Sequence, residues 1–301
     1  MIEGPRAAKP EELKEIIHLT SSIFMPDHPM IMGDLFPQLF SEGNLENLRV
    51  IICDGKLVSH VGIREEDLLI HGYWFRVGMI GSVCTHPEYR RRGYASALVK
   101  DAFSKMMKDG VDFTLISGFR NLYRRAGCVE AGKIYTYEIP SGGLKIKLND
   151  VNIVRYEEAL LNDLVEIYHK EPIRYRRSFE DFKILAGRGF LRNDIKFRIY
   201  IAKIGSRPLA YIATGLLPDE ETPNIVEYAG SREAVLYLLS ELLNNSRINS
   251  VRLSVPYQDV EMLYLLERYG FKKAKSEAPA SISIISLESF LKKVRLLLKE
   301  K

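Results

Sequence analysis

The residues best suited to chemistry lie in one short basic stretch in the first third of the chain. Residues 78–85 are apolar with β-branched side chains and are followed by Pro87, which predicts a buried strand that ends in a turn. From Ala95 to Met106, apolar residues recur at spacings of three and four, which predicts one face of an α-helix. The basic loop between them therefore stands at a helix N-terminus. Unpaired N–H groups and the helix dipole there favour a phosphate or pyrophosphate.

The spacing within this loop is more specific. Its pattern Arg90-x-x-Gly93-x-Ala95 resembles the Gln/Arg-x-x-Gly-x-Gly/Ala loop by which the GCN5-related N-acetyltransferases (GNATs) hold the pyrophosphate of acetyl-coenzyme A (acetyl-CoA). Gly93 has no Cβ, so the backbone can approach phosphate oxygens, and Ala95 is small enough for the first helical turn. The alternative is an ordinary solvated basic loop. The resemblance implies these cofactor-binding residues: Val83, Cys84, Thr85, Arg90, Arg91, Arg92, Gly93, Tyr94, Ala95 and Ser117.

A sheet is needed to position the loop. The Asp-Gly pair at residues 54–55 is a strong hairpin signal between two apolar runs. A His-Gly pair at residues 71–72 predicts a second hairpin, which returns through residues 73–77 into the central strand. We therefore expect at least four antiparallel strands before the loop, in the order that the GNAT fold requires. A first helix is predicted from Pro10, and the Pro- and Met-rich stretch 24–40 is predicted to be irregular.

A second GNAT-like signature follows the central helix. Residues 113–117 predict a strand, and residues 121–128 predict a short helix that contains Tyr123. Cys128 stands where the family usually has phenylalanine. The resemblance implies that Tyr123 protonates the departing thiolate. Such a transfer is chemically workable, because phenols with a pKa near 10 can donate to a thiolate. The alternative is a tyrosine that only packs at the edge of the core.

Direct acyl transfer also requires a base, because an ammonium group has no lone pair with which to attack. The candidates are Glu65, Glu66, His86 and the carboxylate of Lys301, and each could instead be a solvated surface group. A different mechanism would use Cys84 as a covalent nucleophile. A free cysteine on a buried strand more commonly packs as a small apolar side chain, which favours direct transfer.

The pattern of the first half partly repeats after a turn-rich break at residues 140–143. Residues 198–214 again predict strand, turn and strand, and residues 226–230 correspond to the central strand. The loop that follows lacks the Arg-x-x-Gly-x-Ala pattern, and its Glu233 would face phosphate oxygens with a like charge. We therefore predict a GNAT domain with an intact acetyl-CoA loop at 1–145, a degenerate GNAT-like domain at 146–285 and a basic amphipathic helix at 286–301.

Tandem domains of which only the first carries the loop resemble the "enhanced intracellular survival" family of aminoglycoside and lysine acetyltransferases. The resemblance covers roughly the first 285 residues. In that family a third, sterol-carrier-like domain supplies a C-terminal carboxylate as the base. Residues 287–301 predict one amphipathic helix instead, so that role is not carried over.

The composition limits the other function classes. A chain of 301 residues with 46% hydrophobic and 27% charged residues is an ordinary folded protein with room for two domains. Its net charge of +4 suits an anionic cofactor, and no zinc spacing or dense basic helix indicates a nucleic-acid partner. No apolar run is long enough for a membrane span and no signal-peptide core opens the chain, so we expect no membrane partner and a cytoplasmic location.

The sequence thus predicts a mixed α/β protein of tandem GNAT-like domains, each a mostly antiparallel mixed sheet flanked by helices. The predicted reaction moves an acetyl group from acetyl-CoA, as co-substrate, to a primary amine by direct attack in a ternary complex, without a metal. The alternative is a catalytically inactive acyl-CoA sensor. The identity of the amine and the oligomeric state do not follow from the sequence.

Overall fold

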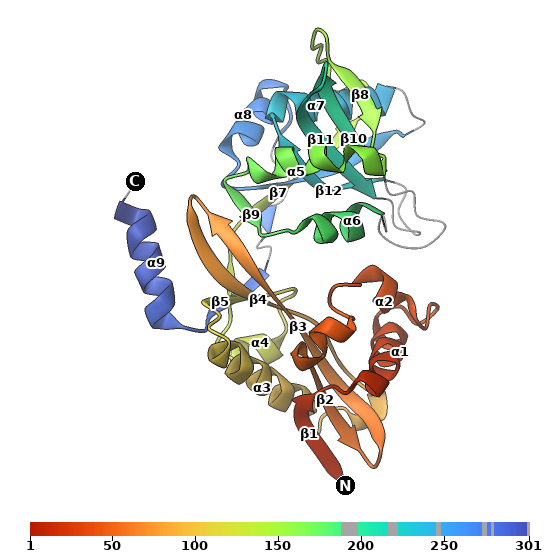
Figure 1. Ribbon diagram of the computed structural model, residues 1–301, viewed down its shortest axis with the longest axis vertical. Coiled ribbons are helices and arrows are strands. Elements are labelled where there is room, and N and C mark those ends of the chain that lie inside the picture. Colours follow the sequence, from red (N-terminus) through yellow and green to blue (C-terminus); the bar gives the residue numbers. More distant parts are fainter. Residues whose placement is uncertain (188–197, 216–221, 245–247, 273–275, 278–279, 300–301) are drawn as a thin grey trace. The chain divides into compact units, whose positions relative to one another are not determined.

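The computed structural model describes residues 1–187, 198–215, 222–244, 248–272, 276–277 and 280–299, and the chain divides into two compact units (Figure 1). The first unit comprises Met1–Ala131 with Pro279–Lys301, and the second comprises Gly132–Ala278. Each unit contains a mixed sheet flanked by helices. This confirms the predicted fold class.

Four antiparallel strands precede the basic loop in the first unit. They are β1 (Ile2–Ala7), β2 (Leu48–Cys53), β3 (Lys56–Ile70) and β4 (Tyr73–Thr85). Both predicted hairpins form. Their turn residues have the positive φ angles that tight hairpin turns need, 49° at Asp54, 80° at Gly55, 46° at His71 and 93° at Gly72. The sequence had not indicated β1.

The sheet changes direction after β4, which runs parallel to β5 (Phe113–Ile116). The two strands pair only as far as Ile80 and Ile116, so the end of β4 has an unpaired edge next to the basic loop. A bulge at residues 82–83 lies in this part of β4, and Ser82 has a φ of 49° there. Strands β15 (Ala280–Ile284) and β6 (Val129–Ala131) complete the sheet.

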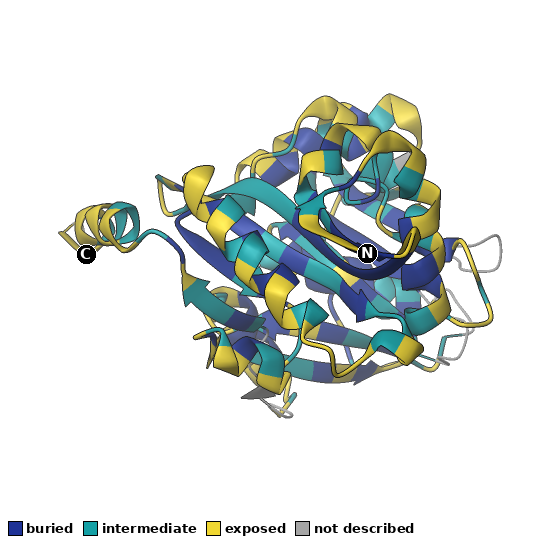
Figure 2. Cartoon of the chain, turned by 90° about the horizontal axis from the view of Figure 1, so that it is seen from below, coloured by how far each residue is buried: buried dark blue, intermediate teal, exposed yellow. Residues whose placement is uncertain are grey.

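Helices cover both faces of this sheet (Figures 1 and 2). The helical elements of the first unit are η1 (Pro10–Glu12), α1 (Leu13–Phe24), α2 (Ile31–Leu35), η2 (Glu42–Asn47), η3 (Pro87–Tyr89), α3 (Tyr94–Lys108), α4 (Asn121–Arg125) and α9 (Leu287–Lys299). The face of α3 that the sequence predicted is buried on one side of the sheet, through Leu98, Val99, Ala102 and Met106. The apolar residues of α1 and α2 pack on the other side.

The second unit repeats the arrangement of the first. Its strands are β7 (Ile134–Pro140), β8 (Asn152–Arg155), β9 (Ile173–Tyr175), β10 (Arg198–Ile204), β11 (Arg207–Gly215), β12 (Asn224–Gly230), β13 (Ser250–Pro256) and β14 (Ser276–Glu277). Its helices are η4 (Glu158–Leu160), α5 (Leu161–His169), α6 (Phe179–Gly187), α7 (Arg232–Asn244) and α8 (Val260–Arg268). The sheet again runs antiparallel up to the central strand β12, which is followed by a parallel partner, β13.

The division between the units differs from the expected one, because each sheet contains a strand that the sequence order assigns to the other half. Strand β7 lies between β13 and β14, and β15 lies between β5 and β6. The turn at residues 140–143, where a boundary was expected, therefore falls inside the second unit. The C-terminal helix α9 also belongs to the first unit, where Ser289 and Lys293 donate to the buried carboxylate of Asp112, both at 2.5 Å. None of the helices in the described part of the chain is long and apolar enough to span a membrane.

Candidate active site

The basic loop connects the end of β4 to the start of α3. Gly93 is the N-cap of α3 and has a φ of 82°, a left-handed conformation that strains any residue with a Cβ. A Cβ added there would meet no heavy atom within 4 Å beyond the chain neighbours. Backbone conformation, rather than crowding within the protein, therefore explains the glycine. The open space in front of the helix N-terminus is available to an anion.

A cavity of about 380 Å³ lies beside this loop. Its lining residues are Ile23, Val83, Cys84, Thr85, Arg90, Ala95, Arg120 and Leu122. Five of these eight were predicted to contact the cofactor, namely Val83, Cys84, Thr85, Arg90 and Ala95. The cavity thus joins the unpaired end of β4, the first turn of α3 and the start of α4.

Two arginines project onto the end of β4. Arg90 Nε donates to the Thr85 carbonyl oxygen at 3.2 Å, and Arg120 Nη1 donates to the Val83 carbonyl oxygen at 3.3 Å. Both residues are exposed, and each brings positive charge to the cavity while its guanidinium bonds to a neutral carbonyl. The sequence reasoning missed Arg120. A cation three residues before Tyr123, at the start of the second signature, was the signal that could have found it.

The other predicted loop residues do not line the cavity. Arg92 lies over the ring of Tyr89, 5.0 Å from its centroid, and donates to the Glu88 carbonyl oxygen at 3.4 Å. Arg91 has a left-handed φ of 63°. Arg92 therefore stabilises the turn, which leaves Arg90 as the loop arginine at the cavity.

Three further predicted residues are not among those that line the cavity. Tyr94 packs against the apolar cluster under α3, and Ser117 is exposed directly after β5. His86 belongs to the turn itself. Its backbone N–H donates to the Val58 carbonyl at 2.8 Å, its ring meets Tyr89 edge to face, and its Nε2 lies 3.3 Å from Lys56 Nζ.

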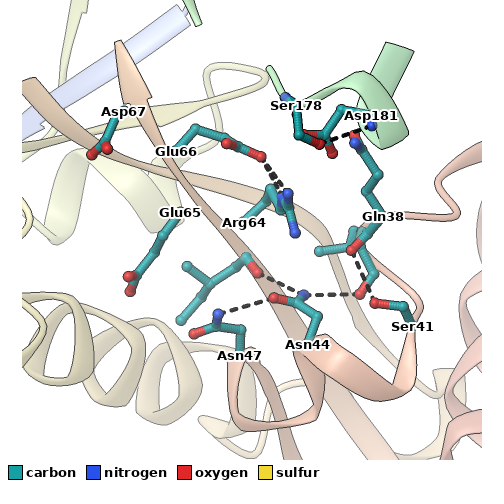
Figure 3. Close-up of polar contacts among 12 residues, drawn as sticks. Gln38, Ser41, Asn44, Asn47, Arg64, Glu65, Glu66, Asp67, Ser178 and Asp181 are labelled. Atoms are coloured by element: carbon teal, nitrogen blue, oxygen red, sulfur yellow. Dashed lines mark hydrogen bonds and ion pairs between the residues drawn. The ribbon is translucent and has the colours of Figure 1, made fainter. Parts of the chain in front are cut away.

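Glu65 and Glu66 lie on β3, and their side chains point in different directions (Figure 3). Glu66 is opposite Val77 on β4. Val77 lies six residues before Val83, a separation of about 20 Å along the strand at ~3.3 Å per residue. Glu66 pairs with Arg64, and Glu65 pairs with Arg76 at 2.8 Å. Burial, followed by a hydrogen bond with Asp109, raises the pKa of Glu65. Neither carboxylate can reach an amine at Val83, so the prediction that they act as the base is corrected. The Lys301 carboxylate lies outside the described residues.

Tyr123 and Cys84 are both buried close to the cavity. Tyr123 follows the lining residue Leu122 and packs in the cluster under α3, where burial raises the pKa of its phenol above 10. It therefore stays protonated over the whole neutral range. Burial raises the pKa of the Cys84 thiol to about 12. A thiolate at Cys84 is thus disfavoured, which argues against the covalent alternative.

The loop that precedes α7 in the second unit is built differently. Gly230 is the last residue of β12, and a Cβ there would lie 2.2 Å from the Leu209 carbonyl oxygen of the adjacent strand β11. The Glu171 carboxylate accepts from the Gly230 N–H at 2.7 Å and from both terminal nitrogens of Arg232 at 2.8 Å. An internal carboxylate therefore already occupies a backbone donor at the end of β12 and the arginine at the start of α7. The sequence reasoning had assigned this effect to Glu233, which is exposed instead.

Comparison with known proteins agrees with this geometry. Residues 5–131 match the family model of the acetyltransferase (GNAT) domain. This part of the chain belongs to the GNAT superfamily. A search of curated proteins finds none that matches the sequence. The GNAT domain indicates acyl transfer from an acyl-CoA.

Solved structures resemble the chain over both units. A probable N-acyltransferase from Enterococcus faecalis has a TM-score of 0.75 at 19% identity, covering 97% of this chain and 74% of that one. A GCN5-related N-acetyltransferase from Anabaena variabilis has a TM-score of 0.73 at 18% identity, with 95% and 74% covered. Eis1 from Mycobacterium abscessus has a TM-score of 0.68 at 16% identity, with 96% and 75% covered. At these identities the similarity shows the fold, which is of the tandem GNAT type.

Proposed function

We propose that this protein transfers an acetyl group from acetyl-CoA to a primary amine by direct attack in a ternary complex. The observation that carries the proposal is the cavity in the first unit, where an open helix N-terminus, the unpaired edge of β4 and two arginines meet. This combination suits a ligand that has both phosphates and an amide-containing arm.

The residues present fit acetyl-CoA. The open space at Gly93 and the N–H groups of residues 90–95 would receive the pyrophosphate, together with Arg90. The backbone of residues 83–85 would pair with the pantetheine amides. Arg120 adds a second positive charge at the same cavity, next to Val83. When bound, acetyl-CoA supplies the acetyl group as a thioester.

The side chains around the cavity would then assist the transfer. A backbone N–H near Cys84 donates to the carbonyl oxygen on which negative charge develops. The neutral amine forms the new C–N bond as the C–S bond breaks, and Tyr123 gives its phenolic proton to the departing sulfur. The amine loses one proton to water. We assign no protein base, because Glu65 and Glu66 are out of reach and His86 faces the turn.

Two measurements test this function. Calorimetry should give one acetyl-CoA site per chain, because the Glu171 carboxylate already occupies the arginine and a backbone donor at the loop of the second unit. Release of free thiol should require an amine, and we suggest spermidine, kanamycin and a lysine-containing peptide as a panel. Coenzyme A binding without thiol release on any amine would favour the inactive sensor.

A further inference from the structure

One side chain at the cavity comes from a helix that the cofactor does not need. Seven of the eight described residues that line the cavity belong to β4, the basic loop, the first turn of α3 or the start of α4. The eighth, Ile23, lies near the end of α1. It is half-buried and packs against the apolar cluster that contains Cys84. The cavity therefore reaches from the cofactor elements to the side of the sheet that α1 covers.

The sheet limits how far the arm of acetyl-CoA can follow β4. With its pyrophosphate at residues 90–95, the arm would run along the free edge of the strand from Thr85 towards Val83. Strand β5 already occupies this edge at Ile80, three residues before Val83, which leaves about 10 Å of free edge at ~3.3 Å per residue. The acyl end of the cofactor must therefore turn away from the edge, towards one face of the sheet.

The two faces of the sheet differ at this point. On the α3 face, Val83, Leu98 and Val99 belong to one closely packed cluster and are all buried, so that face has no room for an acyl chain. On the other face, Cys84 belongs to the cluster of α1, and Ile23 packs against that cluster. Because the proposed oxyanion donor is near Cys84, the acyl group should lie between Cys84 and Ile23.

We propose that the side chain of Ile23 forms the end wall of the acyl site and restricts the cofactor to short acyl groups such as acetyl. This inference rests on the proposed acetyl transfer and adds the residue that selects the acyl donor. A β-branched side chain on a helix is restricted to few rotamers, so Ile23 cannot readily turn away from a longer chain. Truncation to alanine would leave space in which the two further methylene groups of a butyryl chain become buried.

Calorimetry with acetyl-CoA and butyryl-CoA is the direct test, and it needs no amine. Wild-type protein should bind butyryl-CoA about tenfold more weakly than acetyl-CoA, a difference of about 1.4 kcal/mol. Ile23→Ala should bind butyryl-CoA about tenfold more tightly than wild-type protein does, while its acetyl-CoA Kd stays within about threefold. An unchanged butyryl-CoA Kd in folded Ile23→Ala would overturn the proposal.

The same helix offers a matched control in Ile17. This isoleucine is also half-buried and packs against the same cluster, but it faces α2, where a Cβ built on Gly33 would lie 3.1 Å from its Cδ1 atom. Ile17→Ala should therefore lose similar stability and keep the wild-type preference for acetyl-CoA. A gain in butyryl-CoA affinity equal to that of Ile23→Ala would refute the role of Ile23.

A milder variant covers the case in which Ile23→Ala does not fold. Ile23→Val removes one methyl group and keeps the β-branched shape, so it should favour butyryl-CoA in the same direction by a smaller factor. No shift in folded Ile23→Val would then overturn the proposal.

Turnover separates this inference from the proposed function. Thiol release from acetyl-CoA by wild-type protein with the amine panel tests acetyl transfer itself, whereas the two Kd values test Ile23 even when no amine of the panel reacts. With a reactive amine, the ratio of kcat/KM for butyryl-CoA to that for acetyl-CoA should rise about tenfold in Ile23→Ala. An unchanged ratio in an active variant would refute selection of the acyl group by Ile23.

Discussion

Replacing Gly93 by glutamate tests the cofactor loop in two separable ways. The variant must place a side chain at a φ of 82°, which costs roughly 1–2 kcal/mol of stability for a residue with a Cβ. For a unit of this size, such a loss lowers the Tm by about 2–8 °C. The protein should nevertheless stay folded, because a Cβ at Gly93 meets no crowding atom within 4 Å.

The larger effect of Gly93→Glu should be on cofactor affinity. A carboxylate 4 Å from a phosphate charge costs about 4 kcal/mol at an effective dielectric constant of 20, and about 2 kcal/mol at twice that distance. Either value exceeds the ~1.4 kcal/mol of a tenfold change, so we expect the acetyl-CoA Kd to rise more than tenfold. Calorimetry at two salt concentrations should show the difference shrinking as screening increases.

The same helix offers a matched control. Gly110 follows the C-terminus of α3, has a φ of 75° and also has open space where a Cβ would lie. Gly110→Glu should therefore lose similar stability without changing the acetyl-CoA Kd. Equal affinities of Gly93→Glu and Gly110→Glu in folded protein would refute the assignment of the pyrophosphate to this loop.

Three further predictions address the neighbouring residues. Tyr123→Phe should reduce the rate of the chemical step on the order of 10²-fold and change the basic limb of the pH profile, while the acetyl-CoA Kd stays within about threefold. Burial raises the pKa of the Tyr123 phenol, so the wild-type enzyme should keep its proton donor into alkaline pH and lose it only above the usual phenol pKa near 10. A Tyr123→Phe variant with wild-type turnover across the pH range would exclude Tyr123 as the proton donor. Arg120→Ala should weaken acetyl-CoA binding in a salt-dependent manner, and an unchanged Kd would remove this arginine from the site. Glu171→Gln should lower the free energy of unfolding by about 2 kcal/mol, because it weakens the half-buried pair with Arg232. Glu166→Gln, in the exposed pair with Lys170, should cost less. Equal losses in the two variants would contradict a structural role of Glu171 at the second loop.

Local sequence signals predicted most of the scaffold of the site. The Asp-Gly pair at 54–55 formed the expected hairpin because both residues tolerate positive φ. The spacing from Ala95 to Met106 correctly predicted the buried face of α3. The sequence could not show how far the candidate bases are from the loop. Glu65 and Glu66 are on the strand that pairs with β4, but their partners on β4 lie about 17 and 20 Å along that strand from Val83, at ~3.3 Å per residue.

The sequence by itself determined the elements whose information is local, namely the strand that ends before Pro87, the left-handed glycine and the amphipathic helix behind it. Only the tertiary structure decided which strands become neighbours. An apolar run such as β7 or β15 carries the same pattern whichever sheet it joins, and its partners are distant in sequence. The same reason separates the two loops. The charge that closes the second comes from Glu171, 59 residues before Gly230, and only folding brings that carboxylate to the loop.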